Sequence, residues 1–151
     1  MVEEGDCELL WEWANDPQVR ESSFSPDPIP WEDHVAWFRR KRADPRCHMY
    51  IVTDEGGRPV GQVRFDLRAD HNAEVDISIA EAERGRGYAV AALRLGCERV
   101  REAGGRTIVA YIKEENTASL RAFSGAGFAF EGLGREKRHP AVRMTLPADE
   151  A

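Results

Sequence analysis

The sequence has few of the features that assign a protein to a disulfide-rich, metal-binding or membrane class. Only three cysteines occur among its 151 residues, and no two of them have the close spacing of a zinc site or a disulfide framework. No apolar run approaches the roughly 20 residues that a membrane-spanning helix needs. These absences predict a soluble, cytoplasmic protein that has no bound metal and no membrane partner.

An excess of positive charge is also lacking. The chain has 21 Lys and Arg residues against 27 Asp and Glu residues, which gives a formal net charge of -6. Proteins that bind nucleic acid usually carry a net basic face that neutralises phosphates, so nucleic acid is not expected as a partner. Any site for an anion must therefore be built locally.

The stretch 83–93, ERGRGYAVAAL, is a candidate for such a local anion site. It is not a dinucleotide fingerprint, because Val90 stands where the third glycine is required, and the chain has no Gly-Lys-Ser/Thr triplet of a triphosphate loop. It still joins a short turn to a helix N-terminus, whose free N–H groups can bind phosphate. Its glycines permit close approach of the backbone, and its arginines add positive charge.

Hydrophobic periodicity predicts a single α/β domain over residues 1–151. Apolar residues at helical spacing indicate helices at 7–14, 31–42, 88–103 and 117–127. Runs with strand character lie at 47–54, 59–67, 73–80, 107–113 and 141–146. No repeat or linker interrupts this order, which is typical of a mixed central sheet with flanking helices.

Two of these predicted elements carry further detail. In the helix 31–42, Trp31, Val35 and Phe38 form the expected apolar stripe. In the strand 73–80 the alternation is strict, so that Glu74 and Asp76 lie on the face opposite the apolar residues. This strand directly precedes the candidate anion loop.

The segment 84–89, RGRGYA, resembles the pyrophosphate loop of the GNAT superfamily of acetyl-CoA-dependent acetyltransferases, whose pattern is Arg/Gln-x-x-Gly-x-Gly/Ala. Downstream, Asn116, Ser119, Gly127 and Phe128 stand where the same family has its second signature. The resemblance covers nearly the whole chain. It implies a GNAT fold, acetyl-CoA as the cosubstrate, and transfer of an acetyl group to an amine.

The resemblance also implies how acetyl-CoA is bound. The pyrophosphate would lie on the backbone of 84–89, the pantetheine arm would follow the strand 73–80, and a backbone N–H near Ile79 would hold the oxyanion. The residues expected to bind the cosubstrate are Ile79, Arg84, Gly85, Arg86, Gly87, Tyr88, Ala89, Asn116, Ser119 and Phe123.

Acetyl transfer needs a proton acceptor, because an amine with a pKa of about 8 to 10 is mostly protonated at pH 7. Related transferases often place this base on the strand before the loop, so Glu74 is the first candidate and Asp76 the second. The alternative is that both acids are simply solvated. Many members have a tyrosine that protonates the departing thiolate, and Phe123 stands at that position. Ser119, Tyr88 or water is then the expected donor.

The acceptor side is expected in the first 37 residues, which contain all four tryptophans. Aromatic walls suit sugars, bases or a chain terminus, although packing in the core is the alternative for each such residue. This region is similar to the acetyltransferases that modify the 4-amino group of nucleotide-linked amino sugars in pseudaminic acid biosynthesis. The likeness is carried by Arg20, Ser23, Phe24, His34, Trp37, Gln62 and Arg64, and all of these except Ser23 are expected to bind the acceptor.

The beginning of the chain departs from the family pattern. Members usually start with a strand, whereas MVEEGD leads almost directly into the first helix, so the first strand is expected to be missing or truncated. The chain would then be part of a longer fused protein or have a late start, and a homodimer could cover the open sheet edge. Acetylation of ribosomal-protein N-termini and a non-catalytic acyl-CoA-binding domain are the alternative functions.

Overall fold

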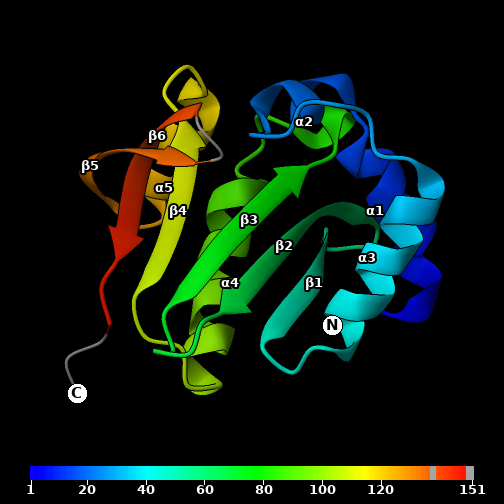
Figure 1. Cartoon of the computed structure of the whole chain (residues 1–151), viewed down its shortest axis with the longest axis horizontal. Coiled ribbons are helices and arrows are strands. Elements are labelled where there is room, and N and C mark those ends of the chain that lie inside the picture. Colours follow the sequence, from blue (N-terminus) through cyan, green and yellow to red (C-terminus); the bar gives the residue numbers. More distant parts are fainter. Residues whose placement is uncertain (137–138, 149–151) are drawn as a thin grey trace.

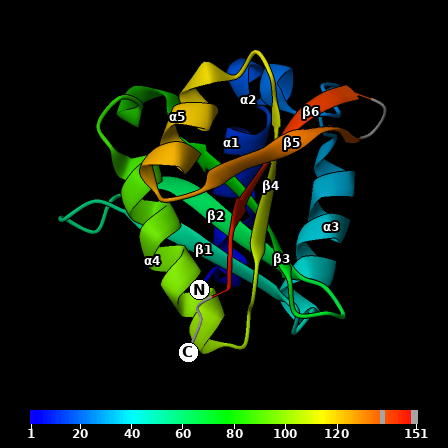
Figure 2. The same ribbon diagram turned by 90° about the vertical axis from the view of Figure 1, so that its left-hand side faces the viewer.

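The computed structural model describes residues 1–136 and 139–148, which form one mixed sheet with helices on both of its faces (Figures 1 and 2). The strands are β1 (Cys47–Thr53), β2 (Pro59–Leu67), β3 (Ala73–Ile79), β4 (Ile108–Lys113), β5 (Ala129–Glu136) and β6 (His139–Leu146). The helices are α1 (Cys7–Ala14), α2 (Pro17–Ser22), α3 (Trp31–Ala43), α4 (Tyr88–Glu102) and α5 (Thr117–Gly125). In the described part of the chain, no helix is both long and apolar enough to span a bilayer.

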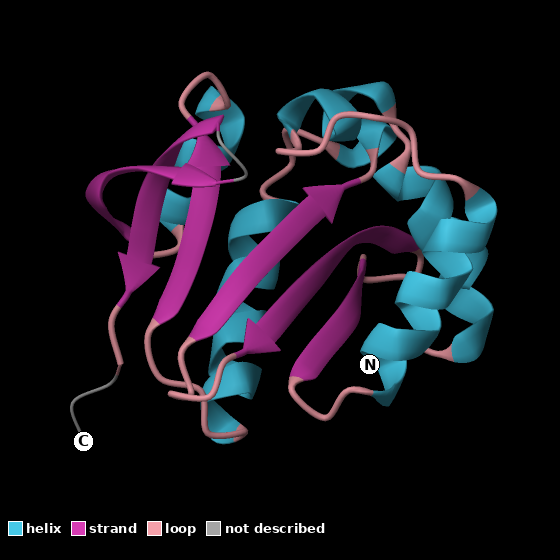
Figure 3. Ribbon diagram, in the orientation of Figure 1, coloured by secondary structure: helices cyan, strands magenta, loops and turns pink. Residues whose placement is uncertain are grey.

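The sheet has the order β1-β2-β3-β4-β6-β5 and consists of two antiparallel halves (Figure 3). The halves meet where β3 and β4 run parallel, and these two strands are paired only at Ala73–Ile108 and Glu74–Val109. Beyond that point they diverge, as Figure 1 shows. The predicted mixed α/β sheet is confirmed, and the divergence opens a gap in its centre.

The two faces of the sheet are covered by separate apolar clusters. α4 and α5 pack on one face through a large cluster that includes Phe65, Leu93, Val100 and Ile108, each with no exposed surface. On the other face, α1 and α3 pack on β1 through a smaller cluster that includes Leu10 and Phe38. Only the β1 side of this second face is filled by apolar residues, so the part over β3 and β4 is left for a site.

The apolar stripe predicted for α3 is partly wrong. Phe38 is buried as expected, but Trp31 is 40% exposed and His34 is only 3% exposed. The imidazole is buried because its Nε2 lies 2.9 Å from the carbonyl oxygen of Cys7, which satisfies a polar atom that would otherwise be costly to bury.

Two elements were not predicted. α2 begins at Pro17, and its N-terminus is capped by Asp16, whose Oδ1 accepts hydrogen bonds from Gln18 N at 2.9 Å and Val19 N at 3.3 Å. The same Asp-Pro pair that ends the first helix therefore starts the next. β5 forms because it pairs with β6 along its length, although it contains two glycines.

Residues 1–6 do not form a first strand. In this described segment, Val2 N donates to the carbonyl oxygen of Met49 at 2.9 Å, and a single 3-10 turn follows at Glu4–Asp6. β1 is consequently the edge strand on this side of the sheet, with one backbone bond to the N-terminal segment. The prediction that residues 1–6 form no first strand is confirmed.

The three cysteines are free thiols that differ in environment, and this predicts a difference in reactivity. Burial, together with the neighbouring Asp66 carboxylate, raises the pKa of Cys47 to about 12, and burial raises that of Cys97 to about 12. The thiolate is the reactive form, so at pH 8 iodoacetamide should modify the partly exposed Cys7 and spare the other two until urea unfolds the chain. Peptide mass spectrometry measures this order, and equal labelling of all three thiols would contradict it.

Candidate active site

The loop between β3 and α4 has the backbone conformation of an anion site. Gly85 and Gly87 have φ values of +80° and +82°, a left-handed conformation that favours glycine, and no atom lies within 4 Å of a Cβ built at either position. Gly87 is the N-cap of α4, and its carbonyl oxygen accepts the first bond of the helix, from Ala91 N at 3.3 Å. The N–H groups of residues 88–90 therefore have no carbonyl in their own helix and face open space.

Arg84 of this loop is bound to protein atoms. Its Nε donates to the carbonyl oxygen of Ile79 at 3.0 Å, its Nη1 donates to Oε1 of Gln18 at 2.8 Å, and its Nη2 lies 3.4 Å from Oδ1 of Asp16. Arg84 thus fixes the loop to the end of β3 and to the start of α2. These contacts hold the loop in shape and occupy the guanidinium of Arg84.

Arg86 has the opposite character, since 60% of its side chain is exposed. Its Nη1 lies 3.3 Å from Oε2 of Glu83, a buried carboxylate that is also paired with Arg58 from the turn between β1 and β2. The loop is therefore supported from two sides, and Arg86 keeps an exposed guanidinium beside the glycines.

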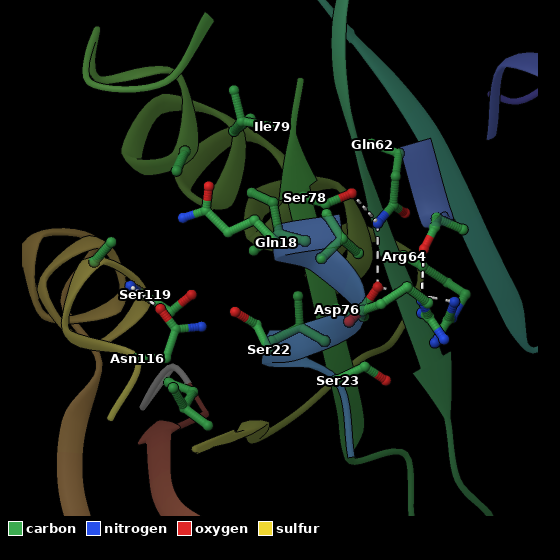
Figure 4. Close-up of a pocket in the computed structure, with 18 of the residues that line it drawn as sticks. Gln18, Ser22, Ser23, Gln62, Arg64, Asp76, Ser78, Ile79, Asn116 and Ser119 are labelled. Carbon is green, nitrogen blue, oxygen red and sulfur yellow. Dashed lines mark hydrogen bonds and ion pairs between the residues drawn. The ribbon is translucent and has the colours of Figure 1, made fainter. Parts of the chain in front are cut away.

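A cavity of about 820 Å³ runs from this loop, past the divergent strands, to the inner side of α1, α2 and α3. Figure 4 shows Asn116 and Ser119 on one side of it, Gln62, Arg64 and Asp76 on the other, and Ser22 and Ser23 of α2 and its following loop between them. The cavity therefore joins the anion loop to the region that was expected to bind the acceptor. The predicted residues that line it are Arg20, Phe24, His34, Trp37, Gln62, Arg64, Asp76, Ile79, Arg84, Gly85, Gly87, Tyr88, Ala89, Asn116, Ser119 and Phe123.

The two candidate bases on β3 are placed differently. Glu74 lies at the paired end of the strand, outside the cavity lining, and its carboxylate is 2.7 Å from Nη2 of Arg68. Asp76 lies one pleat further along, where β3 has diverged from β4, and its side chain is 57% exposed. Nε2 of Gln62 donates to it at 3.1 Å. The structure brings Asp76 to the cavity and leaves Glu74 beside it.

Arg64 belongs to a charged network on the floor of the cavity. Its Nε is 3.0 Å from Oδ2 of Asp66, its Nη1 is 3.9 Å from Oδ2 of Asp76, and its guanidinium lies 5.1 Å from the centre of the Trp37 ring. Burial lowers the pKa of Arg64, but Asp76 and Asp66 raise it by more, so that the guanidinium is held in its charged form. Its charge is committed to two carboxylates of the protein.

Arg20 and His34 likewise bind the protein. The Arg20 guanidinium donates to the carbonyl oxygens of Ala14 at 2.6 Å and Ser25 at 2.8 Å, which shapes the segment after α2. His34 packs against Trp37 and Phe38, and burial lowers its pKa, which favours the neutral ring. Both residues touch the cavity, and their polar atoms are engaged in holding its wall.

Asn116, Ser119 and Phe123 lie on the α5 side of the cavity. Oδ1 of Asn116 caps α5 by accepting a bond from Ser119 N at 3.2 Å. Phe123 is 3% exposed and packs edge-to-face on Phe128, with ring centres 5.0 Å apart. No side-chain hydroxyl stands at position 123, so a proton for a leaving group must come from elsewhere.

Sequence reasoning missed several residues of the cavity wall. Tyr111 and Lys113 of β4 lie on the same strand face, and both line the cavity together with Gln18 and Ser78. Alternation in the stretch TIVAYIK could have indicated that Tyr111 and Lys113 share one face of this strand. Among residues 1–136 and 139–148, no three His, Cys, Asp or Glu side chains are grouped as a metal site would require.

A loop with the geometry of an anion site and a carboxylate share one cavity, an arrangement that suits a group transferase with a phosphate-bearing cosubstrate. Residues 1–129 match the family model described as an acetyltransferase (GNAT) domain. The chain therefore belongs to the GNAT acetyltransferase family, whose cosubstrate is acetyl-CoA.

Two known proteins are similar to this chain in sequence. The chain is 33% identical over 113 residues to YwnH of Bacillus subtilis, a putative phosphinothricin acetyltransferase, covering 71% of this chain and 68% of YwnH. It is 27% identical over 139 residues to the uncharacterized protein MJ1062 of Methanocaldococcus jannaschii, covering 89% of this chain but only 28% of that protein.

A solved structure confirms the fold. The aminoglycoside acetyltransferase AAC(6')-Ib, in complex with ribostamycin and coenzyme A, superposes with a TM-score of 0.86 at 19% identity, over 97% of this chain and 90% of the other. At 19% identity, the similarity concerns the fold alone.

Proposed function

We propose that this domain transfers the acetyl group of acetyl-CoA to a primary amine by direct attack in a ternary complex, and that the acceptor is a nucleotide-linked 4-amino sugar. The observation that carries the proposal is the continuity of the cavity, which joins the loop at Gly85 and Gly87 to the carboxylate of Asp76. One continuous cavity of about 820 Å³ can hold both substrates together.

The loop and the divergent strands suit the cosubstrate. The pyrophosphate would lie on the free N–H groups at the start of α4, with Arg86 adding charge. The pantetheine arm would enter the gap between β3 and β4, where the facing edges of the two strands are unpaired beyond Glu74 and Val109. The thioester then reaches the face of the sheet that carries Asp76.

The direction of the β3 backbone supports an oxyanion donor near Ile79. Ala80 N donates to Val60 O on the β2 side at 2.8 Å, whereas Ala73 N donates to Thr107 O on the β4 side at 2.9 Å. N–H groups alternate between the two sides of a strand, so those of Ile77 and Ile79 point into the gap toward β4. A donor there can stabilise the negative charge that develops on the carbonyl oxygen.

The reaction then needs proton movements at the amine and at the thiolate. Asp76 takes a proton from the bound ammonium, directly or through water, and the freed lone pair attacks the thioester carbon. The collapsing oxyanion then expels the CoA thiolate as the carbon–sulfur bond breaks, and the nitrogen releases its second proton to water. Phe123 cannot protonate this thiolate, so water, Ser119 or Tyr88 supplies the proton. A thiol with a pKa of about 8.5 is a good leaving group and does not require a strong acid.

The acceptor half supports a sugar through its aromatic wall. Trp37 and Phe24 line the cavity, and flat rings stack on the apolar faces of sugars and on bases.

We also propose a cytoplasmic location, because three free thiols are typical of a reducing compartment.

The charges of the same wall favour a second acceptor class, a compact cationic amine. Arg20, Arg64 and Lys113 all bind protein oxygen atoms, whereas Asp27 and Asp33 are exposed carboxylates of the cavity lining. A diphosphate would need free cations, and a polyamine needs free carboxylates. AAC(6')-Ib, which shares this fold, forms a complex with ribostamycin and coenzyme A, and this supports a cationic amine as the acceptor.

Release of free thiol from acetyl-CoA, followed colorimetrically, tests the function. The acceptors are nucleotide-linked 4-amino sugars, ribostamycin, phosphinothricin and peptides with free N-termini, each compared with hydrolysis alone. We expect thiol release above hydrolysis with at least one amine, and the class with the highest kcat/KM identifies the acceptor. Calorimetric binding of acetyl-CoA without transfer to any of them would indicate the non-catalytic alternative.

A further inference from the structure

α2 lies across the open end of the gap between β3 and β4. The two strands separate after Glu74 and Val109, and Figure 1 shows α2 above the end of β3. Ser22 and Ser23, at the end of this helix and just after it, face the cavity between Asp76 and Asn116 in Figure 4. The position of α2 therefore sets the shape of the acceptor half.

The start of α2 is attached to the β3 side. Oε1 of Gln18 and Oδ1 of Asp16 both bind the Arg84 guanidinium, which in turn donates to the carbonyl oxygen of Ile79 at 3.0 Å. Gln18 and Arg84 are 66 residues apart in the chain. Arg84 of the loop between β3 and α4 therefore links α2 to Ile79, the last residue of β3.

The end of α2 is attached to the β4 side by Lys113, the last residue of β4. Its Nζ donates to the carbonyl oxygen of Glu21 at 2.8 Å, across 92 residues of sequence. Lys113 is only 8% exposed. A buried ammonium is costly unless it is bonded, so this contact is strongly preferred over its loss.

We propose that Lys113 is a positioning residue for the acceptor: it fixes α2 across the gap and so presents Ser22, Ser23 and Phe24 to the incoming amine. α2 has six residues, which is too short for a stable isolated helix. Its last carbonyls have no partner in the helix, and a cation there is favoured by both the hydrogen bond and the helix dipole. This inference rests on the proposed acetyl transfer, in which the amine binds in the half of the cavity that α2 lines.

Lys113→Met tests the proposal, because it keeps the length of the side chain and removes the ammonium. Hydrogen exchange of the α2 amides should accelerate about tenfold or more, as expected for the loss of a charged hydrogen bond. KM for the amine should rise about tenfold, while calorimetric affinity for acetyl-CoA stays within about twofold of wild type. Lys113→Arg keeps a charged donor, so its α2 exchange rate and its KM for the amine should both lie closer to wild type than those of Lys113→Met.

Arg106→Met is the matched control, since Arg106 is an exposed cation outside the cavity lining whose loss removes the same charge. If circular dichroism shows that Lys113→Met is unfolded, Lys113→Gln replaces it, with the same expected exchange. The proposal is overturned if α2 exchanges as slowly in the folded variant as in wild type, or if acetyl-CoA and amine affinity fall together. The exchange measurement needs no acceptor, so it stands even if wild type acetylates none of the amines tested.

Discussion

Replacing Gly87 with valine is expected to weaken acetyl-CoA binding at least about a hundredfold, or by about 2.8 kcal/mol. Two effects add. The φ of +82° is strained for any L-residue with a Cβ, by about 1 to 2 kcal/mol. The new side chain would also project into the open space before α4, where no protein atom lies within 4 Å and where the phosphates are expected. Isothermal titration with acetyl-CoA measures the loss.

Gly104→Val is the matched control for this change. Gly104 has a φ of +99° and equally open surroundings, but it follows the far end of α4 and is outside the cavity lining. It should lower the melting temperature about as much as Gly87→Val and leave acetyl-CoA affinity unchanged. Equal, unimpaired binding by both variants would show that the pyrophosphate lies elsewhere.

The sequence predicted those elements whose residues follow a long regular pattern. The strict alternation of β3 and the apolar face of α4 gave boundaries within one residue of those observed. α2 and β5 escaped prediction because neither is stable by its own composition. α2 depends on the Asp16 cap and on contacts with Arg84 and Lys113. β5 contains glycines, which disfavour strands, and it forms because it pairs with β6.

The same distinction applies to the site. The candidate anion loop at 84–89 could be predicted because its chemistry is local: glycines at left-handed positions directly before a helix. The partners of Arg20, Arg64 and Arg84 could not be predicted, because the acceptor atoms belong to the fold rather than to a motif. For that reason the sequence predicted that Arg20, Arg64 and Arg84 bind substrate or cosubstrate. In the structure their guanidinium groups bind oxygen atoms of the chain itself.

The choice between Glu74 and Asp76 shows where pattern alone stops. Alternation places both acids on one face of β3, and nothing in the stretch AEVDISIA separates them. The separation comes from the sheet, because β3 leaves β4 directly after Glu74. Glu74 is therefore held beside the paired strands by Arg68, and Asp76 reaches the cavity.

Asp76→Asn is expected to lower kcat/KM for the amine by about 10² to 10⁴, the range typical of losing a general base. The amide has the same shape and can still accept from Gln62, so calorimetric affinity for acetyl-CoA should be unchanged. The deficit should shrink as pH rises toward the pKa of the acceptor, because a free amine no longer needs a base. Steady-state rates from pH 6 to 10 measure both features.

Glu74→Gln serves as the comparison, since it removes the same charge from the same strand face one pleat away. Glu74→Gln breaks the ion pair between Arg68 and Glu74, whose side chains are 53% and 38% exposed, respectively. An ion pair this exposed contributes little, so the effect on the rate should be less than about threefold. The reverse result, a large loss in Glu74→Gln and a small one in Asp76→Asn, would assign the base to Glu74. Full activity of both variants at pH 7 would mean that solvent takes the proton, and that the gap between β3 and β4 accelerates transfer by orienting the thioester rather than by acid–base chemistry.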